Sequence, residues 1–257
     1  MFFIGAGVSQ SLGLPGSQEL VATMGEELGY DAELFGSYGV PSTLAEYYRH
    51  EQGTIGDLRS RLDSAWHAGI DIGASAIHRH IVRLQPKLIY TTNWDRWLEK
   101  AFEFYNVEFQ VVRHVADLRG ANSAPVQIVK YHGDFSDDES IVLTESSYFD
   151  RMQFETPLDI KLRADSLGRT ILFLGYSLED LNIRFLLYRL FRIWAQSGYA
   201  SAQPKSFLVT DRPNPVQDVV LREWGVSSIV ADGGDTTSER LAGFLSDLRR
   251  EAFDDTD

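Results

Sequence analysis

The chain has 257 residues, 44% of them hydrophobic, which is enough for the core of one large domain or of one domain with a substantial insertion. It has no cysteine, which excludes disulfides, thiol nucleophiles and cysteine-ligated zinc and fits a reducing cytoplasm. The net charge of −13 disfavours direct nucleic-acid binding, and no apolar run reaches the roughly 18 residues that span a bilayer. We therefore expect a cytoplasmic protein without membrane contacts, and the apolar start, which lacks a basic flank, predicts no signal peptide.

The chain opens on an apolar run at 2–4 and a Gly-x-Gly turn at Gly5 and Gly7. The run predicts a short buried strand, and a helical pattern follows from about Ser17. A strand, a glycine-rich turn and a helix can bind a phosphate, although the same order also occurs as ordinary α/β packing. The next glycine is Gly13, so the spacing differs from the Gly-x-Gly-x-x-Gly of dehydrogenases. A dinucleotide site is predicted without the usual hydride-transfer architecture.

Short apolar runs along the chain predict a set of strands separated by helices. The strands are expected at 2–5, 87–91, 109–113, 127–131, 170–174, 206–210 and 226–230. The clearest helices are expected at 94–105, 178–194, 216–224 and 238–253. Most of the runs are continuously apolar, which indicates strands that are buried on both faces. The alternation predicts an α/β fold with a Rossmann-like, doubly wound parallel sheet.

The segment from about 37 to 84 contains no good strand pattern. It has helical patterns at 42–50, 55–66 and 74–84. We interpret it as a helical insertion between the first two strands of a single domain over 1–257. Such a module could cover a cleft, contact another subunit or simply enlarge the fold.

Polar residues follow the predicted strands, and open α/β sheets bind ligands beyond the carboxyl ends of their strands. We expect these residues to share one rim: Gly5, Ala6, Gly7, Ser9, Thr92, Asn93, Asp95, His132, Gly175, Tyr176, Ser177 and Asp211. Each also has a plainer interpretation. Asn93 and Asp95 would cap the helix that begins near Trp94, and Ser177 would be the N-cap of the Leu178 helix, with Glu179 and Asp180 in its first turn.

These residues resemble the motifs of the sirtuin family. The chain contains Gly5-Ala6-Gly7-Val8-Ser9, Thr91-Thr92-Asn93-Trp94-Asp95, His132-Gly133 and Gly175-Tyr176-Ser177, in the family's order. The resemblance covers nearly the whole chain, and four ordered motifs are much more specific than one. It implies a sirtuin-like NAD-binding domain.

The departures from the family pattern matter as much. Without cysteine the zinc ribbon of protein deacylases cannot form, and Pro15-Gly16-Ser17-Gln18 stands where those enzymes have Pro-Asp-Phe-Arg. Thr92 replaces the usual glutamine before the motif asparagine. The chain therefore resembles the bacterial sirtuin-like branch of anti-phage defence, whose members hydrolyse NAD. Some of these work beside a HerA-type ATPase or an Argonaute-like protein.

The resemblance also implies roles for the rim residues. His132 suits a general base that acts on a ribose hydroxyl or on water, and Asn93 suits orienting that water and the ribose. Asp95 suits a hydrogen bond to the nicotinamide amide. Gly5, Ala6, Gly7 and Ser9 would hold the pyrophosphate. Gly175 and Ser177, beside Tyr176, would face the adenosine half of NAD, and Thr92 and Asp211 complete the expected NAD contacts.

The function expected from this resemblance is NAD hydrolysis to nicotinamide and ADP-ribose, without a metal, by an effector that depletes NAD. The chain would act as a homo-oligomer or within a larger assembly. Two alternatives stay open: an NAD- or ADP-ribose-binding regulatory or scaffold subunit of a defence complex, and an NAD-dependent deacylase or ADP-ribosyltransferase. The imidazole of His132 favours catalysis, because a pure sensor does not need a base there.

Overall fold

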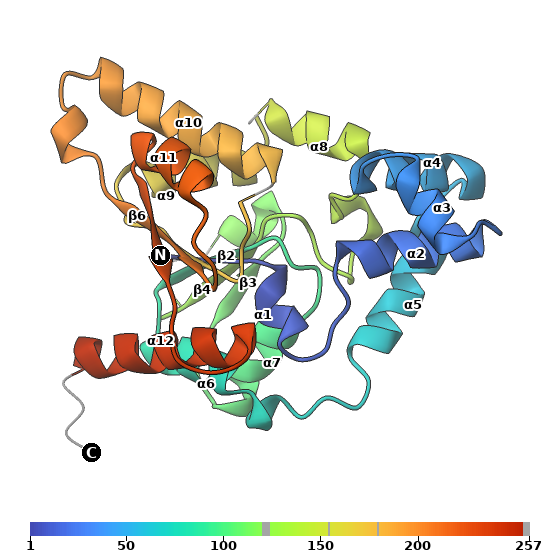
Figure 1. The fold of residues 1–257 in the computed structure, drawn as a ribbon, viewed down its shortest axis with the longest axis horizontal. Coiled ribbons are helices and arrows are strands. Elements are labelled where there is room, and N and C mark those ends of the chain that lie inside the picture. The colour runs from blue at the N-terminus through green and yellow to red at the C-terminus, as the bar shows by residue number, and fades with distance from the viewer. Residues whose placement is uncertain (120–123, 154, 179, 254–257) are drawn as a thin grey trace.

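A parallel sheet forms the centre of the molecule (Figure 1). The computed structural model describes residues 1–257 except 120–123, 154, 179 and 254–257. The strands are β1 (Phe2–Ile4), β2 (Leu88–Thr91), β3 (Gln110–Val112), β4 (Gln127–Lys130), β5 (Leu172–Leu174), β6 (Ser206–Thr210) and β7 (Val226–Val230). All the recorded strand pairs are parallel. The predicted α/β fold with a parallel sheet is confirmed, and each predicted strand is present.

The order of the strands places a crevice beside β1. The sheet runs β3-β4-β2-β1-β5-β6-β7, so β2, β3 and β4 lie on one side of β1, and the chain then crosses to its other side with β5. Without the edge strand β3, this is the doubly wound order of Rossmann folds. Ile4 is in register with both Thr91 of β2 and Leu174 of β5, so the carboxyl ends of these strands lie level. Ligands of such sheets bind where the strand order reverses, which here is between β1 and β5.

Both faces of the sheet are buried because its central strands are apolar throughout. Along β1, Phe3 packs into the hydrophobic cluster on one face, whereas Ile4 packs into the cluster on the other. Phe173 and Leu174 divide in the same way along β5. Successive side chains of a strand point to opposite faces, so a continuous apolar run supplies both clusters at once.

Two layers of helices cover these faces (Figure 1). One layer contributes residues of α9 (Pro157–Leu167), α10 (Leu181–Gln196) and α11 (Pro215–Glu223) to the first cluster. The opposite layer contributes residues of α1 (Ala6–Gln10), α6 (Ala76–Leu84), α7 (Trp97–Phe104) and α12 (Thr237–Phe253) to the second. Helix α8 (Glu145–Met152) lies between the first layer and the helices beside the sheet.

A separate helical cluster stands beside the sheet, on the right in Figure 1. It contains α2 (Ser17–Glu27), α3 (Ala32–Ser37), α4 (Pro41–Gln52) and α5 (Gly56–Trp66). Their apolar side chains form a third core that also includes Phe135, Ile141 and Leu143. Helices occupy all three places predicted for them within 37–84, but α6 packs under the sheet and not in this cluster. The cluster therefore begins before residue 37, at α2, and the single-domain organisation with an insertion at 37–84 stays a prediction.

Two local predictions differ from the structure. The glycine-rich segment is not an open turn, because Gly5 is the N-cap residue of the short helix α1. Ser177 is not the N-cap of the next helix: α10 begins at Leu181, and the carboxylate of Asp180 accepts its first N–H groups. Glu179 lies outside the described residues. The sequence patterns also missed α3, α8 and α9.

No helix in the described ranges is long and apolar enough to span a bilayer.

We predict that Leu162→Ala destabilises the fold by about 2–5 kcal/mol, because it removes a fully buried side chain and leaves a cavity. Leu162 of α9 is 0% exposed, within the first cluster. Ile160→Ala on the same helix is the matched control, since Ile160 is 51% exposed. Urea unfolding of both variants measures the difference. Equal unfolding midpoints would contradict the assignment of Leu162 to the core.

Candidate active site

The backbones that follow β1 and β5 pack against each other without room for side chains. Gly5 N–H donates to Leu174 O at 3.0 Å, and Gly7 N–H donates to Gly175 O at 2.9 Å. A Cβ on Gly5 would lie 2.6 Å from Gly175 O, and one on Gly175 would lie 2.5 Å from Val8 N. Gly175 also has φ +59°, which favours glycine. Glycines are thus required here by the packing of the protein itself.

This packing decides which amide groups remain for a ligand. The N–H groups of Gly5 and Gly7 are already bonded to the β5 side. Ala6 is exposed as the first residue of α1, and its N–H finds no acceptor within the described part of the chain. The glycines therefore serve the contact between the two segments, and Ala6 supplies the donor that stays available beside them.

Ser9, Asn93 and Asp95 form one buried hydrogen-bonded cluster at the end of β2. Asn93 Nδ2 donates to Gly5 O at 3.0 Å and to Ser9 Oγ at 2.8 Å. Ser9 Oγ in turn donates to Asp95 Oδ2 at 2.7 Å. Asp95 Oδ1 accepts the N–H of Trp97, the first residue of α7, at 3.0 Å, but the N-cap residue of this helix is Arg96, so the predicted N-cap role of Asn93 and Asp95 is wrong. These bonds fix the carboxamide and carboxylate against α1.

A buried lysine holds the backbone of the segment that carries Asn93 and Asp95. Lys130, the last residue of β4, is fully buried, and its Nζ donates to the backbone oxygen of Asp95. The carboxylates of Glu99 and Asp134 lie 3.3 and 3.5 Å from the same Nζ. Burial raises the pKa of Glu99, and the charge of Lys130 acts against that rise. A buried cation needs such partners, so this network ties the ends of β2 and β4 together.

His132 lies at the same edge, two residues beyond the end of β4. It is 3% exposed, stacks on Tyr131 and meets the ring of Tyr148 edge-on, with ring centroids 5.4 Å apart in both pairs. Burial lowers the pKa of His132, while the nearby carboxylate of Asp180 works to raise it. The imidazole is therefore neutral near pH 7, which is the form that accepts a proton.

Tyr176 links β1, β5 and Asp180. Its ring packs on Phe3 and Phe173 at centroid distances of 5.4 and 5.9 Å. Its hydroxyl donates to Asp180 Oδ2 at 3.0 Å, and Asp180 Oδ2 also lies 3.5 Å from His132 Nε2. Asp180 was missing from the predicted site. The signal that could have found it is an aspartate directly before a helical pattern, a preferred N-cap residue.

The remaining predicted residues differ in how closely they are connected, and Thr92 is near the site because its side chain hydrogen-bonds with that of Tyr176. Thr92 N–H donates to Ile4 O at 3.4 Å, so Thr92 lies beside β1. The side chain of Ser177 is exposed, and its backbone oxygen accepts from Gln217 at 2.9 Å. Asp211 follows β6, two strands from β1, where its carboxylate accepts from Thr237 at 2.6 Å. The recorded contacts thus join Asp211 to α12 and not to the asparagine and histidine.

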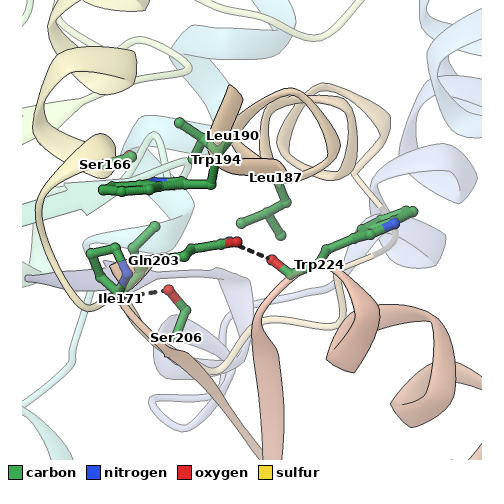
Figure 2. Close-up of a pocket in the computed structure, with 9 residues that line it drawn as sticks. Ser166, Ile171, Leu187, Leu190, Trp194, Gln203, Ser206 and Trp224 are labelled. Carbon is green, nitrogen blue, oxygen red and sulfur yellow. Dashed lines mark hydrogen bonds between the residues drawn. The ribbon is translucent and has the colours of Figure 1, made fainter. Parts of the chain in front are cut away.

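Two hollows in the structure lie away from the rim residues. Figure 2 shows one of about 10 Å³ near the amino ends of β5 and β6, where Ser206 Oγ accepts from Ile171 and Gln203 bonds to Trp224. That volume holds one water at most, and ligands of such sheets bind at the opposite edge. A wider cleft of about 430 Å³ includes Arg113 and Arg151. Both guanidinium groups already face carboxylates of the chain, Asp134 and Asp159.

No group of three or more potential metal ligands occurs among the residues described.

We predict that Gly175→Ala lowers the unfolding free energy by about 2 kcal/mol or more, because alanine meets both a strained φ and the backbone of α1. Gly168→Ala is the matched control, since no atom lies within 4 Å of the Cβ it would add. Urea unfolding compares the two variants. A Gly175→Ala chain as stable as Gly168→Ala would contradict the tight contact between β1 and β5.

We also predict an acid-sensitive contribution from His78 of α6. Burial lowers its pKa to about 4, with the charge of Asp95 opposing the shift. The unfolded chain binds this proton below about pH 6.5 and the folded chain does not, so stability falls as pH drops from 6.5 towards 4. The full effect is about 3 kcal/mol. Unfolding from pH 7 to 4 should show a flatter profile for His78→Gln than for wild type. His50→Gln at an exposed site should leave the profile unchanged, and parallel profiles for all three would refute a buried neutral His78.

Comparisons with known proteins agree with the motifs. The model of the SIR2-like domain matches residues 87–229. The NAD(+) hydrolase ThsA of Enterococcus faecium is 32% identical over 189 residues, which are 72% of this chain and 38% of that protein. ThsA of Bacillus cereus (strain MSX-D12) is 30% identical over 191 residues, 73% of this chain and 39% of that protein. Defense-associated sirtuin 2 of Bacillus subtilis is 28% identical over 229 residues, 86% of this chain and 22% of that protein.

The chain therefore spans well under half the length of these relatives. A solved structure of Sir2 enzymes aligns with 98% of this chain and 92% of its own, at a TM-score of 0.41 and 13% identity. The family match alone covers more than half of the chain and includes the asparagine, histidine and second glycine motifs of the rim. The predicted resemblance is confirmed: this chain belongs to the SIR2-like domain family.

Proposed function

We propose that this chain hydrolyses NAD to nicotinamide and ADP-ribose. One observation carries the proposal. The buried Ser9–Asn93–Asp95 cluster and the neutral His132 lie at the same edge of the sheet, next to the glycine contact where the strand order reverses. A dinucleotide fits this crevice in doubly wound folds. A carboxamide, a carboxylate and a base beside it are suited to cleaving a glycosidic bond.

The proposed orientation of NAD follows from the packing. The pyrophosphate would lie against the segment from Gly5 to Ser9, where the N–H of the exposed Ala6 has no acceptor among the described residues. The nicotinamide ribose would lie toward Asn93 and His132. The adenosine half would extend along Gly175, Tyr176 and Ser177. Thr92 would contact NAD near β1, whereas Asp211, already bonded to Thr237, is the outermost of the proposed contacts.

The proposed reaction breaks the bond between the ribose C1′ and the nicotinamide nitrogen. The electron pair leaves with nicotinamide, so positive charge develops on the ribose, and water adds at C1′. His132 accepts the proton released when water or a ribose hydroxyl reacts, for which its lowered pKa keeps it in the neutral form. Asn93, held by Gly5 O and Ser9, orients the ribose and water. Asp95 would bind the nicotinamide amide while its bonds to Ser9 and Trp97 keep it in place.

The biological role proposed here is depletion of NAD during anti-phage defence. The names of the relatives, NAD(+) hydrolase ThsA and Defense-associated sirtuin 2, support it. Deacylation is less well supported, because a chain without cysteine cannot form the zinc ribbon of sirtuin deacylases. The relatives are much longer, so activation and partners, including a HerA-type ATPase or an Argonaute-like protein, belong to the proposal as well.

We further infer that the chain works as a homo-oligomer. The outer face of α10 carries Leu181, Phe185 and Tyr188 at helical spacing, and Leu181 is 63% exposed. On the adjoining α11, Val216 and Val219 are 76% and 70% exposed. Exposed apolar stripes on neighbouring helices favour contact with another subunit. This surface also supports the alternative of a scaffold subunit, which would bind NAD or ADP-ribose without turnover.

We predict that His132→Ala and Asn93→Ala each lower NAD hydrolysis by about 100-fold or more, because a positioned base contributes about that factor and Asn93 orients the ribose and water on which the base acts. Chromatography of nicotinamide and ADP-ribose after incubation with NAD measures the loss. His50→Ala, which removes an exposed imidazole, is the matched control and should retain wild-type activity.

Two results would count against hydrolysis. Full activity in both variants would place the chemistry elsewhere. A wild-type chain that binds NAD in calorimetry without forming either product, alone or with co-expressed partners, would favour the regulatory alternative.

A further inference from the structure

Asp180 connects three parts of the site that the sequence keeps apart. Its Oδ1 accepts the N–H groups of Asn182 and Ile183 at 2.9 and 3.4 Å, which caps α10. Its Oδ2 accepts the hydroxyl of Tyr176 at 3.0 Å. These three donors fix the carboxylate, which is 12% exposed. Asp180 is therefore a rigid charge and not a mobile surface side chain.

The remaining direction of that carboxylate faces His132. Asp180 Oδ2 lies 3.5 Å from His132 Nε2, an ion-pair distance that is long for a hydrogen bond. His132 Nε2 is buried and has no hydrogen-bond partner in the part of the chain that the structure describes. An unpaired buried nitrogen costs free energy, which a short shift toward Asp180 would recover. The second ring nitrogen is left for another group.

Among the residues that the structure describes, the other groups around His132 do not compete for this nitrogen. From α8, Arg151 lowers its proton affinity and Tyr148 contributes a ring edge. From α9, Asp159 favours the charged form, but it is engaged by Tyr131 and Arg151 at 2.7 and 3.1 Å. The carboxylate that faces the free nitrogen is that of Asp180.

We propose that Asp180 is the positioning residue of His132. It orients the imidazole so that the second nitrogen faces the rim, and it stabilises the imidazolium that forms when His132 takes a proton. The 3.5 Å separation would shorten to a charge-assisted hydrogen bond in that state. The catalytic part of this inference rests on the proposed NAD hydrolysis, whereas the pairing itself does not.

Tyr176 connects the crevice between β1 and β5 to the Asp180–His132 pair. Its ring packs on Phe3 of β1, and its hydroxyl shares the Asp180 oxygen that faces His132. The glycine contact between β1 and β5 thus places Tyr176, which helps place Asp180. A chain of contacts runs from the proposed adenosine side to the base.

Asp180→Asn tests the proposal, because asparagine keeps the N-cap and the side-chain shape but removes the charge. Asp31→Asn is the matched control: Asp31 caps α3 in the same way, with Leu34 N–H donating to it at 3.0 Å, far from any proposed ligand contact. An NMR pH titration of the chain labelled with ¹⁵N-histidine measures the pKa of His132 and so tests whether the imidazole pairs with Asp180. The signal of His132 is assigned by its loss in His132→Ala. Steady-state NAD hydrolysis gives kcat and KM.

We expect the pKa of His132 to fall by about one unit in Asp180→Asn and to stay unchanged in Asp31→Asn, since removing an adjacent carboxylate disfavours the imidazolium. We also expect kcat to fall by about 10- to 1,000-fold with KM for NAD within about threefold of wild type, as for a lost orienting aspartate. The acid limb of the rate profile should move to lower pH.

An unchanged pKa of His132 in folded Asp180→Asn would overturn the pairing. A lowered pKa with unchanged kcat would overturn the positioning role. If wild-type chain forms no product but the pKa still falls in Asp180→Asn, the pairing stands and the proposed function fails. Thermal unfolding of both variants shows whether the caps survive.

Discussion

The site depends on one close contact, the packing of two backbones where β1 and β5 end. Glycine is required on both sides, because a Cβ at Gly5 or Gly175 would lie within 2.6 Å of backbone atoms across the contact. This contact directs the chain from β1 straight into α1 and sets Ser9 toward the end of β2. It also turns the chain after β5 so that Tyr176 covers β1. Without this contact, the rim residues that follow β1 and β2 would not face those that follow β5.

Hydrogen bonds among buried groups then hold the rim in one arrangement. Asn93 is fixed by Gly5 O and Ser9, Asp95 by Ser9 and Trp97, and the loop that carries both is tied to Lys130. Buried polar groups are costly unless they are paired, so each bond removes alternative positions of its partners. The polar groups are therefore arranged before any ligand arrives, which is the condition for effective positioning in catalysis.

The strands were the most predictable part of the fold. Apolar runs such as the ones that became β2 and β4 have no other place in a domain of this size, and their alternation with helices implied the parallel sheet. The missed helices are informative. Helix α9 has a weak apolar pattern, but Thr156, Pro157 and Asp159 form a capping sequence that marks its start. Helix α1 is too short for any periodic pattern.

The site could be predicted only in part. The order of the motifs predicted that polar residues follow the carboxyl ends of neighbouring strands. In the structure, Ser9, Asn93 and Asp95 do contact one another. The pairing of His132 with Asp180 could not be read, because it joins segments beyond β4 and β5 across two intervening strands. The start of α10 could not be predicted either, because serine and aspartate are both preferred N-cap residues and the sequence therefore did not distinguish Ser177 from Asp180. The roles of these residues toward NAD stay predictions.

The most direct test of the proposed NAD site is a crystal structure of His132→Ala with NAD, because this variant should leave the bound substrate intact. We expect the pyrophosphate against the segment from Gly5 to Ser9, the nicotinamide ribose beside Asn93 and residue 132, and the adenosine half along Gly175 to Ser177. NAD bound instead in the cleft of Arg113 and Arg151, with the glycine crevice empty, would contradict the proposed site.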